Sequence, residues 1–496
     1  MKKITYLCLV CLTALLAACA DMGNIKPQTQ QVDANKLVGG KEIAGSTQGV
    51  TVAWPQLEWW HAYGDPQLDG LIAASLSDNP NLHIAEARVR LAQNYAGLAE
   101  AATLPSVGIA TSMTRQLFSE HDFIPPPEAG NYAWYNRAAV EATYDLDLWG
   151  RHRQELASAL DEVKVAAAES QMARLALENN IVRSYVQLSL QFALKDIAEE
   201  TLAHREKALH VMRQRMTAGL ATEVDVTQLE AAVPPLHMQI EQYEESITIL
   251  RHQLAALSGK GPGEGERIAR PVLALDGRSW MQLPSALPAD LIGRRPDVVA
   301  RRWGVEAAAK QIEAAKASFY PNINLMAFIG FQAIGFSKFL SGESAIRGIG
   351  PAISLPIFDG GRLRSNLGAH MAAYDMAVES YNGTLIHALE SVANTLVVAQ
   401  SLQQQKHLND GALATAGKAR ALTSKGFAAG MSDFLLLLNS EVALLAQQQQ
   451  QAQITARMLE SHAALMLALG GGYLPVQVAV EANTPPVDGG KAGTHE

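Results

Sequence analysis

Four segments of the chain alternate apolar and polar residues with a period of two, which is the pattern of a strand with one oily and one wet face. The clearest segment begins at Trp134, and the others begin near Val107, Ile323 and Ile349. The polar face of the clearest segment holds Arg137, Glu141, Asp145 and Asp147. Each segment runs for about ten residues, the length that a tilted strand needs to cross a membrane. We predict two β-hairpins, within about 104–149 and 320–358.

After each hairpin the apolar spacing becomes helical. Residues 151–217 and 362–427 contain no proline, and each stretch would form about 100 Å of helix at 1.5 Å per residue. Between Val226 and Leu257 the apolar positions step by three and four in turn, which predicts a coiled-coil seam. Pro234-Pro235 interrupts this seam, so we expect a bend or a short break there.

The chain also repeats itself at long range. The same interval separates Pro80 from Pro296 and Pro105 from Pro321, and Gly150-Arg151 reappears as Gly361-Arg362. This predicts a duplicated unit. We place the first repeat at 54–257, the second at 291–472, and a linker or equatorial region at 258–290.

Glycines punctuate the long helices of both repeats. Gly219 and Gly430 stand where a helix would stop and reverse direction. We therefore predict two helical hairpins, with tips near 218–222 and 428–433.

The N-terminus has the pattern of an export signal. Lys2 and Lys3 precede an apolar stretch that closes as Leu16-Ala17-Ala18-Cys19, which resembles the lipobox of bacterial lipoproteins. We predict a signal peptide over 1–18, a covalent lipid on Cys19, and a lipid-anchored polar tether over 19–53. The alternative is a plain signal peptide cut near Ala18. Ala20 follows the cysteine, which favours sorting to the outer membrane, and the tail 473–496 is expected to be disordered.

Composition and charge exclude several classes of function. The 496 residues carry a net charge of −9, which offers no footprint for nucleic acid. All three cysteines fall within the first 19 residues, so the mature chain would have no disulfide. We find no metal-binding motif, and the glycines around 411–419 do not have the spacing of a phosphate loop. The sequence therefore predicts neither an enzyme nor a cofactor other than the lipid.

Four strands cannot form a closed barrel alone. Sheet edges cannot remain unpaired in hydrocarbon, and about eight strands is the practical minimum for a barrel. No later segment has the roughly 18 to 20 uncharged apolar residues needed to span a bilayer as a helix. We therefore expect several chains to share one barrel, and three chains would supply twelve strands.

Several motifs then indicate a family. The segments 65–69, 294–298 and 355–362, with the repeats above, resemble the outer-membrane factors of tripartite efflux systems, specifically the NodT-type lipoprotein branch of the TolC-like superfamily. The resemblance spans about 54–472. It implies a mixed α and β membrane protein, namely a homotrimer with a twelve-stranded outer-membrane β-barrel, continued by a long periplasmic α-helical barrel.

The resemblance also implies a function and partners. It implies a passive exit duct in the outer membrane of a Gram-negative cell, lipid-anchored and extending into the periplasm. The duct would carry small molecules, dock to a periplasmic adaptor, and serve an inner-membrane pump of the RND or MFS type. The alternative is a non-conducting lipoprotein scaffold that bridges membranes, although such a tether needs no amphipathic strands.

In this family the helical tips close the periplasmic end and open when the adaptor engages. The corresponding candidates for the gate and for adaptor docking are Gly219, Glu223, Asp225, Gly430, Ser432 and Asp433. Asp433 is the best candidate for an acidic ring, but an ordinary helix cap is an equal alternative. Arg137, Glu141, Asp145 and Asp147 are candidates for the barrel lumen, the alternative being a merely solvated wall.

Overall fold

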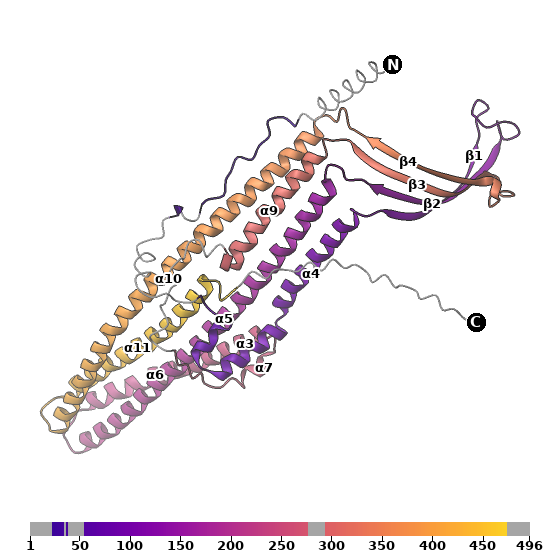
Figure 1. Cartoon of the computed structure of the whole chain (residues 1–496). Coiled ribbons are helices and arrows are strands. Elements are labelled where there is room, and N and C mark those ends of the chain that lie inside the picture. Colours follow the sequence, from indigo (N-terminus) through magenta and orange to yellow (C-terminus); the bar gives the residue numbers. More distant parts are fainter. Residues whose placement is uncertain (1–21, 34–35, 38–53, 276–292, 474–496) are drawn as a thin grey trace, which may run out of the picture.

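The computed structural model describes residues 22–33, 36–37, 54–275 and 293–473. Figure 1 shows a long bundle of helices with a β-sheet projecting from one end. The first repeat contains α4 (Pro80–Ala101), β1 (Ser106–Leu117), β2 (Tyr132–Asp145), α5 (Arg151–Thr217) and α6 (Glu223–Leu257). The second contains α9 (Pro296–Ala317), β3 (Asn322–Ile334), β4 (Ala345–Ser354), α10 (Arg362–Ala428) and α11 (Phe434–Ala468). The described part of the chain also contains the shorter elements η2 (Trp59–Tyr63), α3 (Pro66–Asp78), α7 (Pro262–Gly265) and η3 (Gly342–Ser344).

The two repeats match in element lengths as well as in order. Helices α5 and α10 are 67 residues long, and α6 and α11 are 35 residues long. Both long helices begin after a glycine with positive φ, Gly150 at 77° and Gly361 at 88°. Glycine adopts this left-handed conformation without the steric cost that other residues meet.

The sheet is antiparallel throughout, in the order β1-β2-β3-β4. Its centre is the pair β2 and β3, in which Val140 lies opposite Ile329, so each repeat contributes one hairpin and the hairpins join side by side. The strand bounds differ from the sequence pattern in two places. Strand β2 ends at Asp145 rather than continuing to Leu148, and β4 ends at Ser354 rather than near Ile357, because Ser354 pairs with Asn322, the first residue of β3.

The prediction of a break in α6 is wrong. Helix α6 runs without interruption from Glu223 to Leu257 with both Pro234 and Pro235 inside it. Each proline removes one donor from the helical ladder. Packing on both sides of the pair, with Leu229 and Leu254 fully buried against the rest of the protein, holds the helix together.

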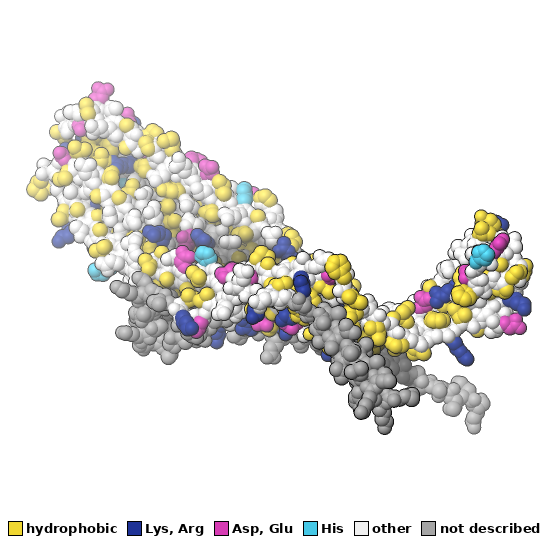
Figure 2. Space-filling view, turned by 90° about the horizontal axis from the view of Figure 1, so that it is seen from above, with side chains coloured by type: hydrophobic (Ala, Val, Ile, Leu, Met, Phe, Trp, Pro, Cys, Tyr) yellow, Lys and Arg dark blue, Asp and Glu magenta, His cyan; other side chains and the backbone are white. Residues whose placement is uncertain are grey.

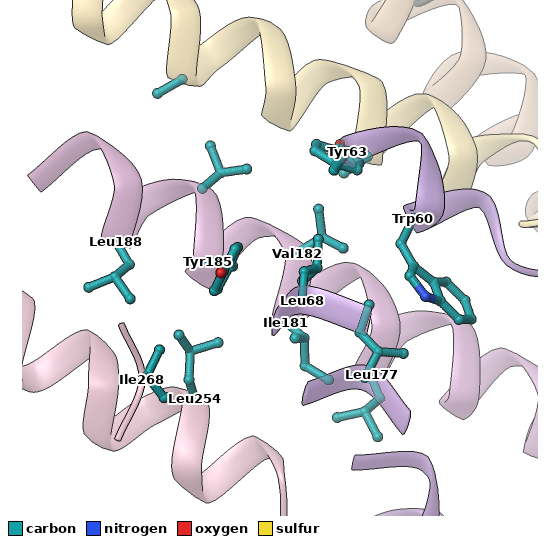
Figure 3. Close-up of a cluster of buried hydrophobic side chains, with 14 of the residues drawn as sticks. Trp60, Tyr63, Leu68, Leu177, Ile181, Val182, Tyr185, Leu188, Leu254 and Ile268 are labelled. Atoms are coloured by element: carbon teal, nitrogen blue, oxygen red, sulfur yellow. The ribbon is translucent and has the colours of Figure 1, made fainter. Parts of the chain in front are cut away.

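The main core lies at the equator of the bundle, where η2, α3 and Ile268 pack against α5, α6 and α11 (Figure 3). Its largest buried side chains include Tyr63, Leu68 and Tyr185. The carboxylate of Asp65 accepts hydrogen bonds from Tyr185 Oη at 2.8 Å and from the backbone N of Val272 at 2.8 Å. Part of the expected linker is therefore packed structure; residues 276–292 lie outside the described part.

The described part of the expected tether is a docked strap. Residues 22–33 run along α10 (Figure 1). The backbone N of Gln28 and of Thr29 donate to Asp375 Oδ1 at 2.9 and 3.1 Å, and the side chain of Asn382 bonds the backbone of Gln30 and Val32. Within the tether predicted over 19–53, residues 28–32 are thus bonded to α10. The signal peptide, Cys19 and the tail 474–496 lie outside the described residues.

One helix corrects the sequence analysis on membrane spans. By length and composition alone, α10 is apolar enough to cross a membrane, and it is the one such helix in the described part. This is weak evidence for a span, because α10 packs along α9 and α11 in the bundle. Contacts with α9 and α11 bury Val378, Leu385 and Val392, while Met376 and Ile386 remain exposed.

Candidate functional site

The two faces of the sheet carry different chemistry. The apolar face includes Val107 and Ile109 of β1, which are 71% and 79% exposed, and Ile349 and Ile353 of β4. The polar face carries Arg137 and Glu141 of β2, whose side chains form an ion pair at 2.6 Å. Figure 2 shows apolar side chains over the base of the sheet and charged groups toward its loop end.

The polar face is also tightly curved. Gly330 approaches the backbone of Ala138 and Ala139 so closely that a Cβ there would overlap them. The ring of Phe328 covers Gly348, and the guanidinium of Arg137 lies 5.7 Å from the centre of that ring. Small residues on this face let the strands bend toward it, as closure into a barrel requires.

Asp145 and Asp147 lie at the junction between strand and helix. Asp145 is the last residue of β2, and its Oδ2 accepts a hydrogen bond from Asn322 Nδ2 at 2.9 Å. Asp147 lies beyond the strand with a φ of 44°, and its carboxylate accepts from the backbone N of His152 and Arg153 at the start of α5. The expectation that Asp147 stands on the strand is therefore wrong, because the chain has already turned toward the helix.

The tip of the first helical hairpin is built from a glycine turn and a capping box. Gly219 has a φ of 72°, and the next residue, Leu220, donates its backbone N–H to Arg215 O at 2.8 Å. The carboxylate of Asp225 accepts from the backbone N and the hydroxyl of Thr222 at 2.8 and 2.7 Å. The Thr222 hydroxyl and then its backbone N–H hold the pKa of Asp225 below its usual value. Asp225 therefore works as a helix cap.

The second tip repeats the design with a simpler cap. Gly430 has a φ of 71°, and Met431 donates its backbone N–H to Gly426 O at 2.8 Å. The side chain of Asp433 accepts from the backbone N of Leu436 at 2.8 Å, so Asp433 is the N-cap of α11. The hydroxyl of Ser432 faces the backbone of Thr423 on α10. Glu223 occupies the first turn of α6.

The two hairpins touch each other just above their tips. Met212, Val226 and Leu229 of the first hairpin are buried beneath Phe427 and Phe434 of the second. The guanidinium of Arg215 lies 4.9 Å from the centre of the Phe427 ring. These contacts join α5 and α6 to α10 and α11 within one chain.

A charged cluster lies farther from the tips, and the sequence analysis missed it. Arg205 of α5 is only 6% exposed, and its Nη1 has no hydrogen-bond partner in the described part of the chain. Glu441 of α11 is the charge that acts on it, and Glu441 also pairs with Arg420 of α10 at 3.8 Å. Burial lowers the pKa of Arg205, and Glu441 opposes that shift. No motif marks these residues, because they lie far apart in the sequence and meet only when the hairpins pack.

The ends of the tips expose large apolar side chains. They are Leu220, Val224, Met431, Leu435 and Leu436. Such a group at the end of a molecule is typical of a surface that another protein covers. Among the residues that the structure describes, no group of three or more His, Cys, Asp or Glu side chains is placed to hold a metal ion.

A family model described as outer membrane efflux protein matches residues 71–260 and 287–471. The chain is 44% identical over 366 residues to the fusaric acid resistance protein FusA of Burkholderia cepacia, covering 73% of this chain and 68% of FusA. It is 30% identical over 469 residues to the multidrug resistance outer membrane protein MdtP of Shigella flexneri, covering 93% and 95% of the two chains.

Solved structures show the same architecture. The outer membrane protein VceC of Vibrio cholerae superposes with a TM-score of 0.79 at 34% identity, covering 84% of this chain and 100% of VceC. The outer-membrane channel OprN superposes with a TM-score of 0.80 at 26% identity, covering 90% of this chain and 99% of OprN. The predicted fold of a TolC-like outer-membrane channel is confirmed.

Proposed function

Because this chain belongs to the outer membrane efflux protein family, we propose that three copies of it form the exit duct of a tripartite efflux system. The duct is passive, and the energy comes from an inner-membrane pump of the RND or MFS type through a periplasmic adaptor. The observation that carries this proposal is a four-stranded sheet with one apolar face and two open edges, β1 and β4. A soluble tether has no use for an exposed apolar face of this size.

The open edges determine how copies meet. In hydrocarbon, each unpaired backbone N–H or C=O group costs several kcal/mol of free energy. Strand β1 of one copy must therefore pair with β4 of the next. Three copies give twelve strands with the apolar face toward lipid and the polar face toward the lumen. Arg137, Glu141 and Asp145 then line or border the lumen, and Asp147 fixes the start of the helical tube.

The periplasmic gate is formed by the two tips. The caps at Asp225 and Asp433 keep the two turns rigid, while the contacts above them hold the two hairpins together. Opening requires the hairpins to separate, and the adaptor docks on the exposed apolar side chains of the tips. In this proposal the acidic residues act mainly through helix capping, and any acidic ring at the constriction comes from Asp433.

The lipid on Cys19 would complete the attachment to the outer membrane. The strap begins at Met22, which packs with Ile25 against Phe319 and Leu367 near the base of the sheet. The strap therefore leads from the level of the strands down the outside of the bundle, which is compatible with a lipid held at the membrane surface.

Two measurements test the proposal. The chain has no cysteine after Cys19, so a cysteine at Thr111 of β1 can be combined with single cysteines scanned along β4. Closure between copies predicts covalent trimers for pairs in register and none for either single variant. In planar bilayers the purified protein should give unitary conductance, whereas a non-conducting scaffold, the rival function, gives none.

The cargo is a separate question from the duct. One relative is named for fusaric acid resistance and another for multidrug resistance. We propose small organic molecules as cargo, with selection by the pump. Loss of the gene should sensitise cells to compounds that the cognate pump exports, and the adaptor that co-purifies with the trimer identifies that pump.

A further inference from the structure

Two arginines stand on the apolar face of the sheet, where a cation is least expected. In β1 the residues on this face are Val107, Ile109, Thr111, Met113, Arg115 and Leu117. In β4 they are Ala345, Arg347, Ile349, Pro351 and Ile353. The register confirms the face, since Arg115 lies opposite Trp134 of β2 and Arg347 lies opposite Ile329 of β3.

Within the part of the chain that the structure describes, neither arginine has a partner of opposite charge. Both side chains are exposed, and in the described residues neither forms an ion pair. Arg137, on the polar face, is by contrast paired with Glu141 at 2.6 Å. The acid in the loop between β3 and β4, Glu343, is itself paired with Lys338 at 3.3 Å. The loop between β1 and β2 holds Glu120, Asp122 and Glu128, and no ion pair joins either arginine to a carboxylate of the described residues. A ligand or a neighbouring copy can therefore supply the countercharge.

Both arginines lie toward the loop end of their strands, beyond most of the exposed apolar residues of this face. Each is two residues from the loop end of its strand, Leu117 in β1 and Ala345 in β4. Below them the exposed apolar residues continue to Leu104 on one edge and Ile357 on the other. At about 3.4 Å per residue and a tilt of about 40°, these stretches span roughly 20–25 Å, close to the apolar band of an outer-membrane barrel.

This level decides the environment of the two guanidinium groups. An arginine facing lipid costs about 2–4 kcal/mol at the middle of the bilayer and about 0–1 kcal/mol near its surface. The two arginines are therefore at the headgroup level of the leaflet that faces away from the helices. Guanidinium groups bind phosphate through paired, charge-assisted hydrogen bonds.

The two arginines also occupy the two open edges. When β1 of one copy pairs with β4 of the next, Arg115 and Arg347 approach each other from different subunits. Trp134 beside Arg115 provides an exposed aromatic ring at the same level, as aromatic girdles do in membrane barrels. Each subunit contact thus combines two unpaired cations and an aromatic surface.

We propose that Arg115 of one copy and Arg347 of the next bind the phosphate groups of a phosphorylated glycolipid of the lipid A class in the outer leaflet. Each trimer has one such site at each subunit contact. The bound lipid neutralises the two cations and covers the seam between copies. This inference rests on the proposed trimeric barrel, because one chain supplies only half of the site.

Native mass spectrometry of the full trimer tests the proposal. Three proteins are compared: wild type, the double variant Arg115→Gln/Arg347→Gln and the control Lys338→Gln. Each is reconstituted with bisphosphorylated lipid A, dephosphorylated lipid A or phosphatidylglycerol. Lys338→Gln removes a cation from the same end of the sheet, but from a residue already paired with Glu343. We expect wild type and the control to retain bisphosphorylated lipid A, and the double variant to retain roughly tenfold less.

The other lipids separate the sources of the phosphate. Equal retention of dephosphorylated lipid A, or stronger retention of phosphatidylglycerol, would overturn the proposal, as would a double variant that retains lipid A like wild type. Conductance of the same samples distinguishes failure of the proposed lipid site from failure of the proposed channel. Wild-type channels that conduct without preferring lipid A overturn this inference alone, whereas wild-type protein that forms no channel overturns the proposed function with it.

Discussion

Neutralising Glu441 should loosen the contact between the two helical hairpins. The change Glu441→Gln keeps the size of the side chain and removes its charge. Arg205, which is almost fully buried, then loses the one carboxylate that acts on it within the described residues, and Arg420 loses its partner at 3.8 Å. If the hairpins must separate for the duct to open, the variant should open more readily.

The structure gives the size of this effect. Only the attraction between Glu441 and Arg205 joins the two hairpins, because the pair of Glu441 with Arg420 at 3.8 Å lies within the second hairpin. Two unit charges about 4 Å apart interact by roughly 4 kcal/mol at an effective dielectric constant of about 20, which is an upper limit for that attraction. Partial exposure of Glu441 reduces this value, since exposed pairs contribute about 0–1 kcal/mol and breaking buried pairs costs about 3–5 kcal/mol. A loss of about 2 kcal/mol lies between these limits and corresponds to roughly a 30-fold shift toward the open state.

Single-channel recording in planar bilayers measures this shift as open probability. The matched control is Glu230→Gln. It breaks the ion pair between Glu230 and Arg213, 2.6 Å apart, which lies within the first hairpin and does not connect it to the second. We expect the control to behave like wild type. An open probability of Glu441→Gln equal to that of wild type, with trimers intact, would refute the link between this cluster and the gate.

Four further predictions concern the tips, the lumen and the equator. Asp433→Asn keeps a capping side chain and removes the charge, whereas Asp433→Ala removes both. If Asp433 forms an acidic ring, both variants should reduce cation selectivity. If it acts only as a cap, Asp433→Ala alone should have an effect, a loss of about 1 kcal/mol of stability. Arg137→Gln leaves Glu141 unpaired in the lumen and should shift selectivity toward cations, measured as a reversal potential; no shift would place this pair outside the ion path. Leu229→Ala leaves a cavity at a fully buried position between the hairpins and should lower the free energy of unfolding by about 2–5 kcal/mol. Thermal unfolding measures this loss, and an unchanged melting curve would contradict it. Burial lowers the pKa of His462 from 6.5 to about 4, so protons bind the unfolded chain more readily. Stability should therefore fall as the pH drops below 6.5, by about 3 kcal/mol in total near pH 4, and His462→Gln should flatten this dependence.

The large elements could be predicted because their patterns are strictly periodic. The stretch without proline from Arg151 to Thr217 is one helix in the structure, and Gly219 and Gly430 both end helices with positive φ. Period-two alternation likewise predicted four strands, since one face meets lipid and the other water. The predicted ends of the strands were less accurate, because pairing with the neighbouring strand determines where a strand ends.

Features that depend on long-range contacts could not be predicted. The strap has no periodicity, and its hydrogen bonds to Asp375 join residues more than 340 positions apart. The continuity of α6 through Pro234-Pro235 depends on packing against α5. The capping alternative for Asp433 was recognised, but sequence alone could not say whether its carboxylate turns toward its own helix.

The docked strap would also limit where the proposed lipid on Cys19 can lie. Met22 is held beside Phe319 near the base of the sheet, and three extended residues reach at most about 10 Å back to Cys19. If Cys19 carries the proposed lipid, so short a connection places the acyl group in the same leaflet as the bases of the strands. The proposed anchor would then hold the chain at the depth where its strands assemble.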